Sequence, residues 1–221
     1  MTSAPWPTDL TAVIFDIDGT LLDSADGIVA GFRHALTSVG IAVPDDATLR
    51  SDLGPPIWDY FTSLGLADDR LAQAVLAYRT YYWAEGLHQA AAYAGVPELL
   101  DALSAAQLPL GTATAKRTDT AEAILAAHGL DGYFAVINGA DEARPTKTET
   151  VTDTLVRLGS PDPVRVAMIG DRHFDIAAAR ACGVFAVGVT WGYGPVEELR
   201  DAGADALVDS PAELLAALVQ G

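Results

Sequence analysis

The chain has little cysteine, few basic residues and no long hydrophobic run. Its 221 residues include one cysteine, Cys182, which excludes an intramolecular disulfide. No segment approaches the ~20 consecutive apolar residues that a membrane-spanning helix needs. Residues 1–10 also lack the basic and apolar segments of a secretory signal. We therefore expect a cytoplasmic protein that does not associate with membranes.

Positive charge is scarce, with 13 lysines and arginines against 30 aspartates and glutamates and a net charge of −17. This balance argues against nucleic acid and anionic membranes as partners. An anionic substrate would be repelled by the chain as a whole. Its binding would need a local cation, either a metal ion or a few lysines and arginines.

The order of apolar and polar segments predicts an α/β fold. The apolar residues 12–15 predict a buried strand, and residues 24–93 carry helical patterns at 24–40, 45–53, 56–65 and 68–86 without a convincing strand. After a helix from about residue 96 to 107, strands and helices are expected to alternate. The expected strands are 108–115, 133–139, 164–170 and 184–190, and the expected helices are 118–129, 148–159, 175–183 and 211–219. Such alternation is typical of a parallel sheet with helices on both faces.

Two aspartates directly follow the first expected strand. Asp16 and Asp18 lie beside Gly19, which allows a turn, and Thr20, which can hydrogen-bond that turn or a ligand. Strand ends face the ligand crevice in open α/β sheets, so one carboxylate can serve as a nucleophile and the other as a proton donor. The alternative is that both acids only shape a turn and cap the next helix.

The sequence from Asp16 to Thr20, DIDGT, resembles the first motif of the haloacid dehalogenase superfamily, in its phosphatase branch. The chain is similar to the phosphoglycolate phosphatase-like subgroup. The resemblance implies a Rossmann-like core of residues 1–23 and 94–221, with a helical cap of residues 24–93 inserted after the first strand. It also implies that Asp16 attacks phosphorus to form an aspartyl-phosphate. Asp18 would protonate the leaving oxygen, activate water and bind Mg²⁺ through its backbone carbonyl.

Two further motifs of the family match with different strength. Thr114, followed by Ala115, resembles the second motif, whose hydroxyl binds a phosphate oxygen; Thr112 is the less favoured register. The third motif requires a lysine before a helix. We assign it to Lys147, with Arg144 as a competitor.

The fourth motif is matched by GDRHFD, in which Asp171 and Asp175 are four residues apart. Magnesium prefers oxygen ligands and keeps several waters, so one or two carboxylates suffice. Asp171 is expected to bind Mg²⁺ directly. Asp175 would bind it through water, or orient Asp171 and Lys147. His173 suggests zinc, but no second histidine or cysteine has ligand spacing here.

Substrate choice is expected to lie in the cap. The loop at Gly54 and Pro55 resembles one that enters the active site in relatives, whereas the roles of Arg33, His34, Trp58 and Tyr60 stay open. A phosphonate-cleaving relative would need a cap lysine, and residues 24–93 contain none. The expected substrate-binding residues are Gly19, Thr20, Ala115, Arg144, Gly54 and Pro55.

The motifs together predict a Mg²⁺-dependent phosphomonoester hydrolase acting on a small phosphorylated metabolite. Phosphoglycolate, a nucleoside monophosphate and a sugar phosphate are the candidates. The alternatives are a β-phosphoglucomutase-like phosphotransferase and a non-catalytic binding protein on the same fold. The sequence does not decide between a monomer and a homodimer.

Overall fold

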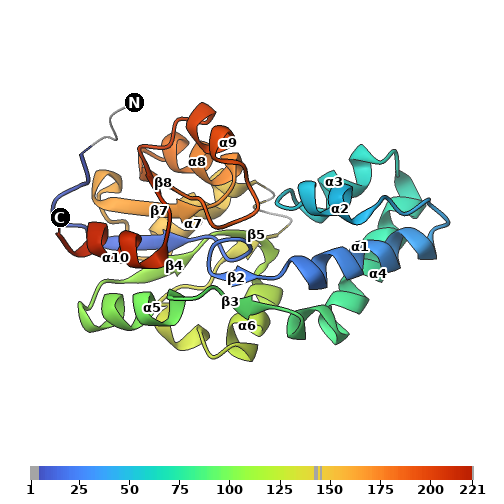
Figure 1. The fold of residues 1–221 in the computed structure, drawn as a ribbon, viewed down its shortest axis with the longest axis horizontal. Helices are drawn as coiled ribbons and strands as arrows, with labels where there is room; N and C mark the ends of the chain where they lie inside the picture. The colour runs from blue at the N-terminus through green and yellow to red at the C-terminus, as the bar shows by residue number, and fades with distance from the viewer. Residues whose placement is uncertain (1–4, 142–143, 145, 221) are drawn as a thin grey trace.

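The computed structural model describes residues 5–141, 144 and 146–220. A five-stranded sheet with all neighbouring strands parallel forms its centre, in the order β4-β1-β7-β8-β9 (Figure 1). The strands are β1 (Ala12–Phe15), β4 (Leu110–Thr112), β7 (Val166–Gly170), β8 (Phe185–Val189) and β9 (Ala206–Val208). The predicted α/β class with a parallel sheet is confirmed. No helix in the described ranges is both long and apolar enough to cross a membrane.

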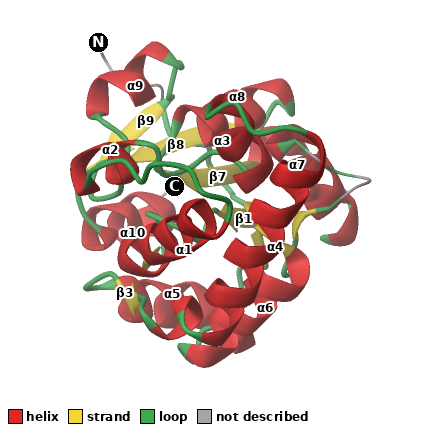
Figure 2. Ribbon diagram, turned by 90° about the vertical axis from the view of Figure 1, so that its right-hand side faces the viewer, coloured by secondary structure: helices red, strands yellow, loops and turns green. Residues whose placement is uncertain are grey.

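Helices cover both faces of this sheet (Figure 2). Successive side chains of a strand point to opposite faces. Val13 and Phe15 belong to one apolar cluster, with α5 (Val96–Ala105), α6 (Thr118–Ala127) and α10 (Pro211–Gln220). Ala12 and Ile14 belong to the other, with α7 (Lys147–Arg157), α8 (His173–Ala181) and α9 (Val196–Asp201). The core is therefore two apolar layers separated by the sheet.

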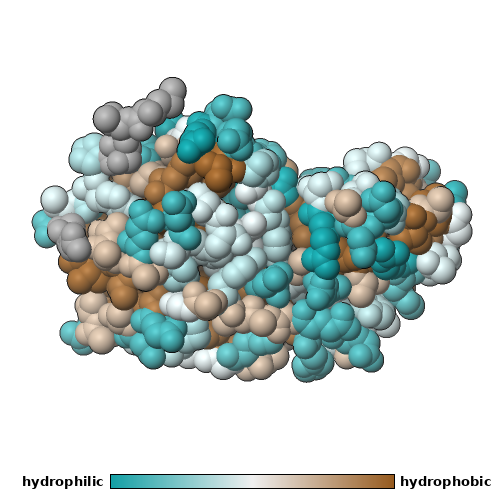
Figure 3. Space-filling view, in the orientation of Figure 1, coloured by the Kyte–Doolittle hydropathy of each residue, from teal (hydrophilic) through white to brown (hydrophobic). Residues whose placement is uncertain are grey.

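Four helices form a second, smaller lobe beside the sheet, visible in Figures 1 and 3. This helical lobe consists of α1 (Ala25–Ser38), α2 (Asp46–Ser51), α3 (Ile57–Ser63) and α4 (Asp68–Ala84). Its interior is aromatic. The rings of Phe32 and Tyr60 stack with their centroids 4.0 Å apart, and Phe61 and Tyr78 pack around them. The rings hold α1, α3 and α4 together and keep Tyr60 away from solvent.

A two-stranded ribbon joins the helical lobe to the core. The chain leaves the core at β2 (Leu22–Asp23) and returns at β3 (Ala91–Ala92), and these strands pair antiparallel. The expectation of no strand within 24–93 was therefore wrong. An alanine pair has no strand propensity of its own, so the pairing with β2 determines its conformation. A short helix, η1 (Gly86–His88), precedes β3. The boundaries at 23/24 and 93/94 stay a prediction.

The predicted strand 133–139 is also wrong. The segment begins in a 3-10 helix, η2 (Asp131–Tyr133), touches the sheet through a bridge between Val136 and Gly111, and ends in β6 (Gly139–Ala140). It runs along the sheet edge beyond β4, where several of its apolar residues keep contact with solvent. Edge segments of this kind need not form a continuous ladder.

Other elements also differ from the expectation. The predicted strand 108–115 is divided into β4 and β5 (Thr114–Arg117), because the chain leaves the main sheet at Ala113 and pairs with β6. Helix α9 and strand β9 were not predicted. A further short helix, η3 (Pro163–Arg165), leads into β7. Short elements carry too few residues for a clear period.

Helix α7 starts at Lys147 because a capping box fixes its first turn. The Thr146 hydroxyl accepts a bond from the Glu149 amide at 3.2 Å, and the Glu149 carboxylate accepts one from the Thr146 amide at 3.0 Å. We expect Thr146→Ala to lower the free energy of unfolding by about 1 kcal/mol in urea titrations. The control is Thr152→Ala, because exposed Thr152 contacts the Thr148 carbonyl within the same helix and Cys182 Sγ at 3.5 Å, and does not cap the start of α7. Equal effects of the two changes would contradict the capping role.

Candidate active site

The predicted nucleophile lies at the carboxyl end of the sheet. Asp16 directly follows β1, and its amide donates to the carbonyl of Ile169 in β7 at 2.9 Å. Gly19 then turns the chain with φ +76°, a conformation that favours glycine. Asp171 directly follows β7. Two neighbouring parallel strands thus present their acids at the same edge of the sheet.

Lys147 lies between two of these acids. Its ammonium is 2.9 Å from Asp16 Oδ1 and 2.8 Å from Asp175 Oδ1, and it donates to the carbonyl of Ala113 at 3.0 Å. Burial works to lower the pKa of Lys147, but Asp16 and Asp175 outweigh it and hold that pKa above its ordinary value. The side chain is a fixed cation at the base of the site.

Asp16, Asp171 and Asp175 form a buried acidic cluster, with one oxygen of each within 4.8 Å of the others. Burial and the neighbouring Asp175 and Asp16 hold the pKa of Asp171 well above its usual range. Burial also raises the pKa of Asp16, to about 6, although Lys147 acts in the opposite direction. Asp171 Oδ1 is buried and has no hydrogen-bond donor among the described residues. Such an oxygen set fits a hard divalent cation, and Mg²⁺ prefers carboxylate ligands.

Glycines allow the backbone to approach Asp171 closely. A Cβ on Gly19 would lie 2.1 Å from Asp171 Oδ2, and a Cβ on Gly192 would lie 2.3 Å from Asp171 Cβ. A Cβ on Gly170 would similarly lie 2.2 Å from Asp175 Cγ. Any side chain at these positions would displace an acid of the cluster.

Lys116 is a site residue that the sequence reasoning missed. Its ammonium lies 2.9 Å from Asp18 Oδ2 and 4.2 Å from the ring centroid of Tyr82, and its side chain is 9% exposed. The Ser24 hydroxyl bonds the other oxygen of Asp18. Lys116 and Lys147 are the two lysines of the whole chain. The scarcity of lysine was the signal available in the sequence. In the structure each lysine pairs with one aspartate of the first motif.

The segment after β8 is a second feature that sequence reasoning missed. The Tyr193 amide donates to Asp171 Oδ2 at 2.7 Å, and the Tyr193 hydroxyl accepts from the Ser24 amide at 2.8 Å. The Trp191 indole donates to the carbonyl of Thr20 at 3.0 Å. This segment ties the acidic cluster to the start of α1. The local sequence shows no motif for it, because Ser24 and Thr20 are about 170 residues away and Asp171 is 22 residues away.

The two threonines considered for the second motif have different surroundings. Thr114 lies at the start of β5, is buried, lines the cavity that contains Asp16, and accepts a weak bond from the Lys116 amide at 3.3 Å. The hydroxyl of Thr112 exchanges hydrogen bonds with the backbone of Asn138, at 3.0 and 2.8 Å. Thr112 therefore links two chain segments, whereas Thr114 faces the site.

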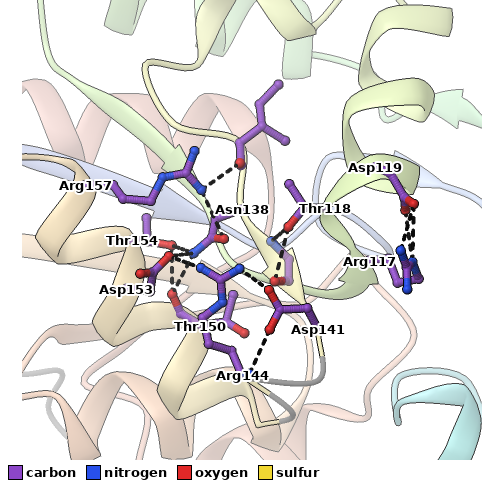
Figure 4. Close-up of polar contacts among 12 residues, drawn as sticks. Arg117, Thr118, Asp119, Asn138, Asp141, Arg144, Thr150, Asp153, Thr154 and Arg157 are labelled. Carbon is purple, nitrogen blue, oxygen red and sulfur yellow. Dashed lines mark hydrogen bonds and ion pairs between the residues drawn. The ribbon is translucent and has the colours of Figure 1, made fainter.

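Arg144 and Lys147, the competitors for the third motif, also differ. The guanidinium of Arg144 pairs with the carboxylates of Asp141 and Asp153 (Figure 4). Asp153 also accepts from the side-chain amide of Asn138 at 3.1 Å, within a polar network beside α7. Lys147 is the residue placed against Asp16 and Asp175. Arg144 instead joins Asp141 to Asp153 of α7.

His173 lies at the start of α8, beside Glu198. Its Nδ1 is 2.7 Å from the Glu198 carboxylate, which also accepts from the Arg172 guanidinium at 2.8 Å. Burial works to raise the pKa of Glu198, but the hydrogen bonds from Arg172 and His173 outweigh it and lower that pKa to about 2. His173 thus belongs to an ion-pair group that joins α8 to α9.

A cavity of about 900 Å³ connects the site to the helical lobe. Asp16, Asp18, Thr114 and Ala115 line it from the core, and Gly54, Pro55 and Trp58 line it from the lobe. Two of the undecided lobe residues have other contacts. Arg33 pairs with Asp46, and the ring of His34 stacks on Tyr81 with centroids 5.1 Å apart.

A family model described as haloacid dehalogenase-like hydrolase matches residues 13–189. The chain belongs to this family. The chain is 41% identical to tyrosine-protein kinase PtkA of Mycobacterium tuberculosis over 184 residues. This alignment covers 82% of the chain and 62% of PtkA. The chain therefore spans less than two thirds of that relative. It is also 35% identical to probable phosphatase IndB of Dickeya dadantii over 212 residues, 93% of this chain and 92% of IndB.

Solved structures agree with this assignment. A predicted phosphatase from Clostridium acetobutylicum superposes with a TM-score of 0.91 at 32% identity, covering 97% of this chain and all of that one. The structure of PtkA superposes with a TM-score of 0.82 at 35% identity, covering 96% of this chain and 99% of that one. The predicted haloacid dehalogenase-like fold is confirmed.

Proposed function

We propose that this hydrolase releases phosphate from phosphomonoesters through covalent attack by Asp16. The supporting observation is the position of Asp16, with Lys147 on one side and Asp171 and Asp175 close by. A carboxylate and a phosphoryl group repel each other, so their reaction needs fixed positive charge beside them. Lys147 supplies one such charge at 2.9 Å from the attacking carboxylate.

The two aspartates of the first motif would divide the work. An Asp16 oxygen forms the new bond to phosphorus while the ester P–O bond breaks. Asp18 donates a proton to the departing oxygen and then accepts one from the water that hydrolyses the aspartyl-phosphate. Lys116 and Ser24 hold the Asp18 carboxylate in place. Thr114 would donate its hydroxyl to a phosphate oxygen, and the backbone at Gly19, Thr20 and Ala115 would surround the phosphate.

Asp16, Asp171 and Asp175, with the backbone carbonyl of Asp18, would hold Mg²⁺. When bound, the ion neutralises charge on the phosphoryl group and on the carboxylates. The residues of the chain position the acids that would hold the ion. Tyr193 fixes Asp171 through its amide, and Lys147 fixes Asp175.

We also propose that residues 24–93 act as a cap that selects the substrate, with Gly54 and Pro55 facing the phosphoryl site. The partner would be a small phosphorylated metabolite. We further propose the cytoplasm as the location, with the chain acting as a monomer or a homodimer.

Phosphate release from p-nitrophenyl phosphate tests the proposal. We expect release in 5 mM MgCl₂, loss on adding EDTA, and recovery when excess Mg²⁺ is restored. Asp171→Asn should weaken Mg²⁺ binding in calorimetry and lower kcat by about a hundredfold or more. The exposed Asp201→Asn serves as control and should behave as the wild type. Release that is unaffected by EDTA and by Asp171→Asn would overturn the metal assignment.

The name of PtkA, a tyrosine-protein kinase, describes phosphoryl transfer to an acceptor other than water. A phosphotransferase on this site would use the same attack by Asp16 and differ only in the second acceptor. Counting free phosphate against phosphorylated acceptor distinguishes the two. A binding protein without catalysis would release no phosphate from any ester.

A further inference from the structure

The cavity of about 900 Å³ is far larger than a phosphoryl group needs. Pockets of ~300–1,000 Å³ accommodate whole drug-sized ligands. Phosphoglycolate would leave most of this space unfilled, because its alcohol part has only two carbons. The composition of the cavity wall therefore bears on the rest of the substrate.

The wall is aromatic on the side of the helical lobe. It includes Phe32 from α1, Trp58 from α3, and Tyr78, Tyr82 and Trp83 from α4. Apart from the two tyrosine hydroxyls, the polar side chains on this side of the cavity are those of Asp59, Arg79 and Thr80, so ring faces outnumber hydrogen-bonding groups there. A hydroxyl left unpaired against such ring faces is costly to bury. This side of the wall therefore suits a flat, largely apolar group.

Two of these aromatic residues have large exposed areas. Trp58 is 43% exposed and Trp83 is 51% exposed, although both line the cavity. The aromatic interior of the lobe is built without them, from Phe32, Tyr60, Phe61 and Tyr78. An exposed tryptophan in a cavity is an unfilled stacking surface. The Arg79 guanidinium, 5.9 Å from the Trp58 ring centroid, supports that ring from one side.

We propose that the preferred substrates are phosphomonoesters whose alcohol part carries a planar aromatic ring system, which contacts Trp58 and Trp83. This inference rests on the proposed function and adds the substrate class. The bond changes are those given above, with the aromatic alcohol as leaving group. A nucleoside monophosphate and a simple arylalkyl phosphate share this chemistry.

Matched pairs of esters test the proposal. Adenosine 5′-monophosphate is compared with ribose 5-phosphate, which lacks only the base. Benzyl phosphate is compared with cyclohexylmethyl phosphate, which has the same kind of alkoxide leaving group without the aromatic ring. We expect kcat/KM to favour the aromatic member of at least one pair by about tenfold or more, since stacking of a base on an aromatic side chain has about that effect. A preference in the first pair alone identifies nucleotides, and one in the second alone identifies arylalkyl esters.

Variants locate the contact. Trp58→Ala and Trp83→Ala should each reduce the preference for the aromatic member by about fivefold or more, and Trp83→Phe should retain most of it. The control is Leu76→Ala, because Leu76 lies on α4, is 66% exposed and does not line the cavity. Ratios near one in both pairs, or equal effects of all three alanine changes, would overturn the proposal and leave the phosphatase function standing.

Binding provides a readout that does not depend on turnover. Tryptophan fluorescence of Asp16→Asn should be quenched by the aromatic member of the preferred pair and much less by its partner. The quenching should diminish in the Asp16→Asn, Trp83→Ala double variant. If the wild type hydrolyses no ester at all, the proposed function fails, and this titration still decides the inference. Equal quenching by both members of each pair would contradict it.

Discussion

Phosphate release falls at least about a thousandfold when Asp16 is replaced by asparagine, if Asp16 is the nucleophile. The amide has the same shape but cannot form an acyl phosphate by direct attack, so both half-reactions stop. Single-turnover mixing with a radiolabelled ester, followed by acid quenching, measures the covalent intermediate. Label should remain on the wild-type chain and be absent from Asp16→Asn. Normal turnover by Asp16→Asn would contradict the assignment.

Stability measurements show whether that loss comes from misfolding. In the metal-free protein the pKa of Asp16 is raised to about 6 by burial, so between its usual value of 3.8 and about 6 the folded state keeps a proton that the unfolded state loses. Stability from this group therefore falls as pH rises through that interval. Asparagine does not ionise, so Asp16→Asn does not lose this stability as pH rises. We expect Asp16→Asn in EDTA to have the higher melting temperature, by a larger margin near pH 8 than near pH 4.

Replacing Lys147 by methionine is expected to damage both activity and stability. The ammonium contacts Asp16 and Asp175, and its side chain is 10% exposed, so its loss leaves buried carboxylates unpaired. Removing one partner of a buried ion pair costs about 3–5 kcal/mol. We expect a lower melting temperature in EDTA near pH 8, and a loss of kcat of about a hundredfold or more even in saturating Mg²⁺.

Arg144→Met is the matched control for Lys147→Met. It also removes a cation, but from the pairs with Asp141 and Asp153. It should therefore lower the melting temperature while losing far less activity. If Arg144→Met stopped turnover and Lys147→Met did not, the third-motif role would belong to Arg144.

The sequence predicted those features that local patterns determine. Asp16 and Asp171 each follow an unbroken apolar run, and such runs are typical of central parallel strands, so their position at the sheet edge followed from the pattern. The segment 133–139 has a similar apolar run but lies at the edge, and only short pieces of it pair. An apolar run alone does not distinguish a central strand from an edge segment.

Contacts between residues far apart in the chain could not be predicted from local patterns. Lys116 meets Asp18, and Tyr193 meets Ser24 from 169 positions away, through segments that no spacing rule connects. Local patterns did not decide between Arg144 and Lys147 either, because Arg144 lies three residues before Lys147, the first residue of α7. The structure separates their surroundings, since Arg144 pairs with Asp141 and Asp153, outside the acidic cluster that Lys147 contacts.

The two lysines of the chain make the site spectroscopically visible. Lys116 and Lys147 are both nearly buried, one beside each aspartate of the first motif. A sample grown with isotope-labelled lysine would give two side-chain signals, and each would report on one half of the reaction centre. Reagents that modify side-chain amines would likewise react with no other side chain than these two lysines. The binding of an ion or an ester could thus be followed residue by residue without any engineered label.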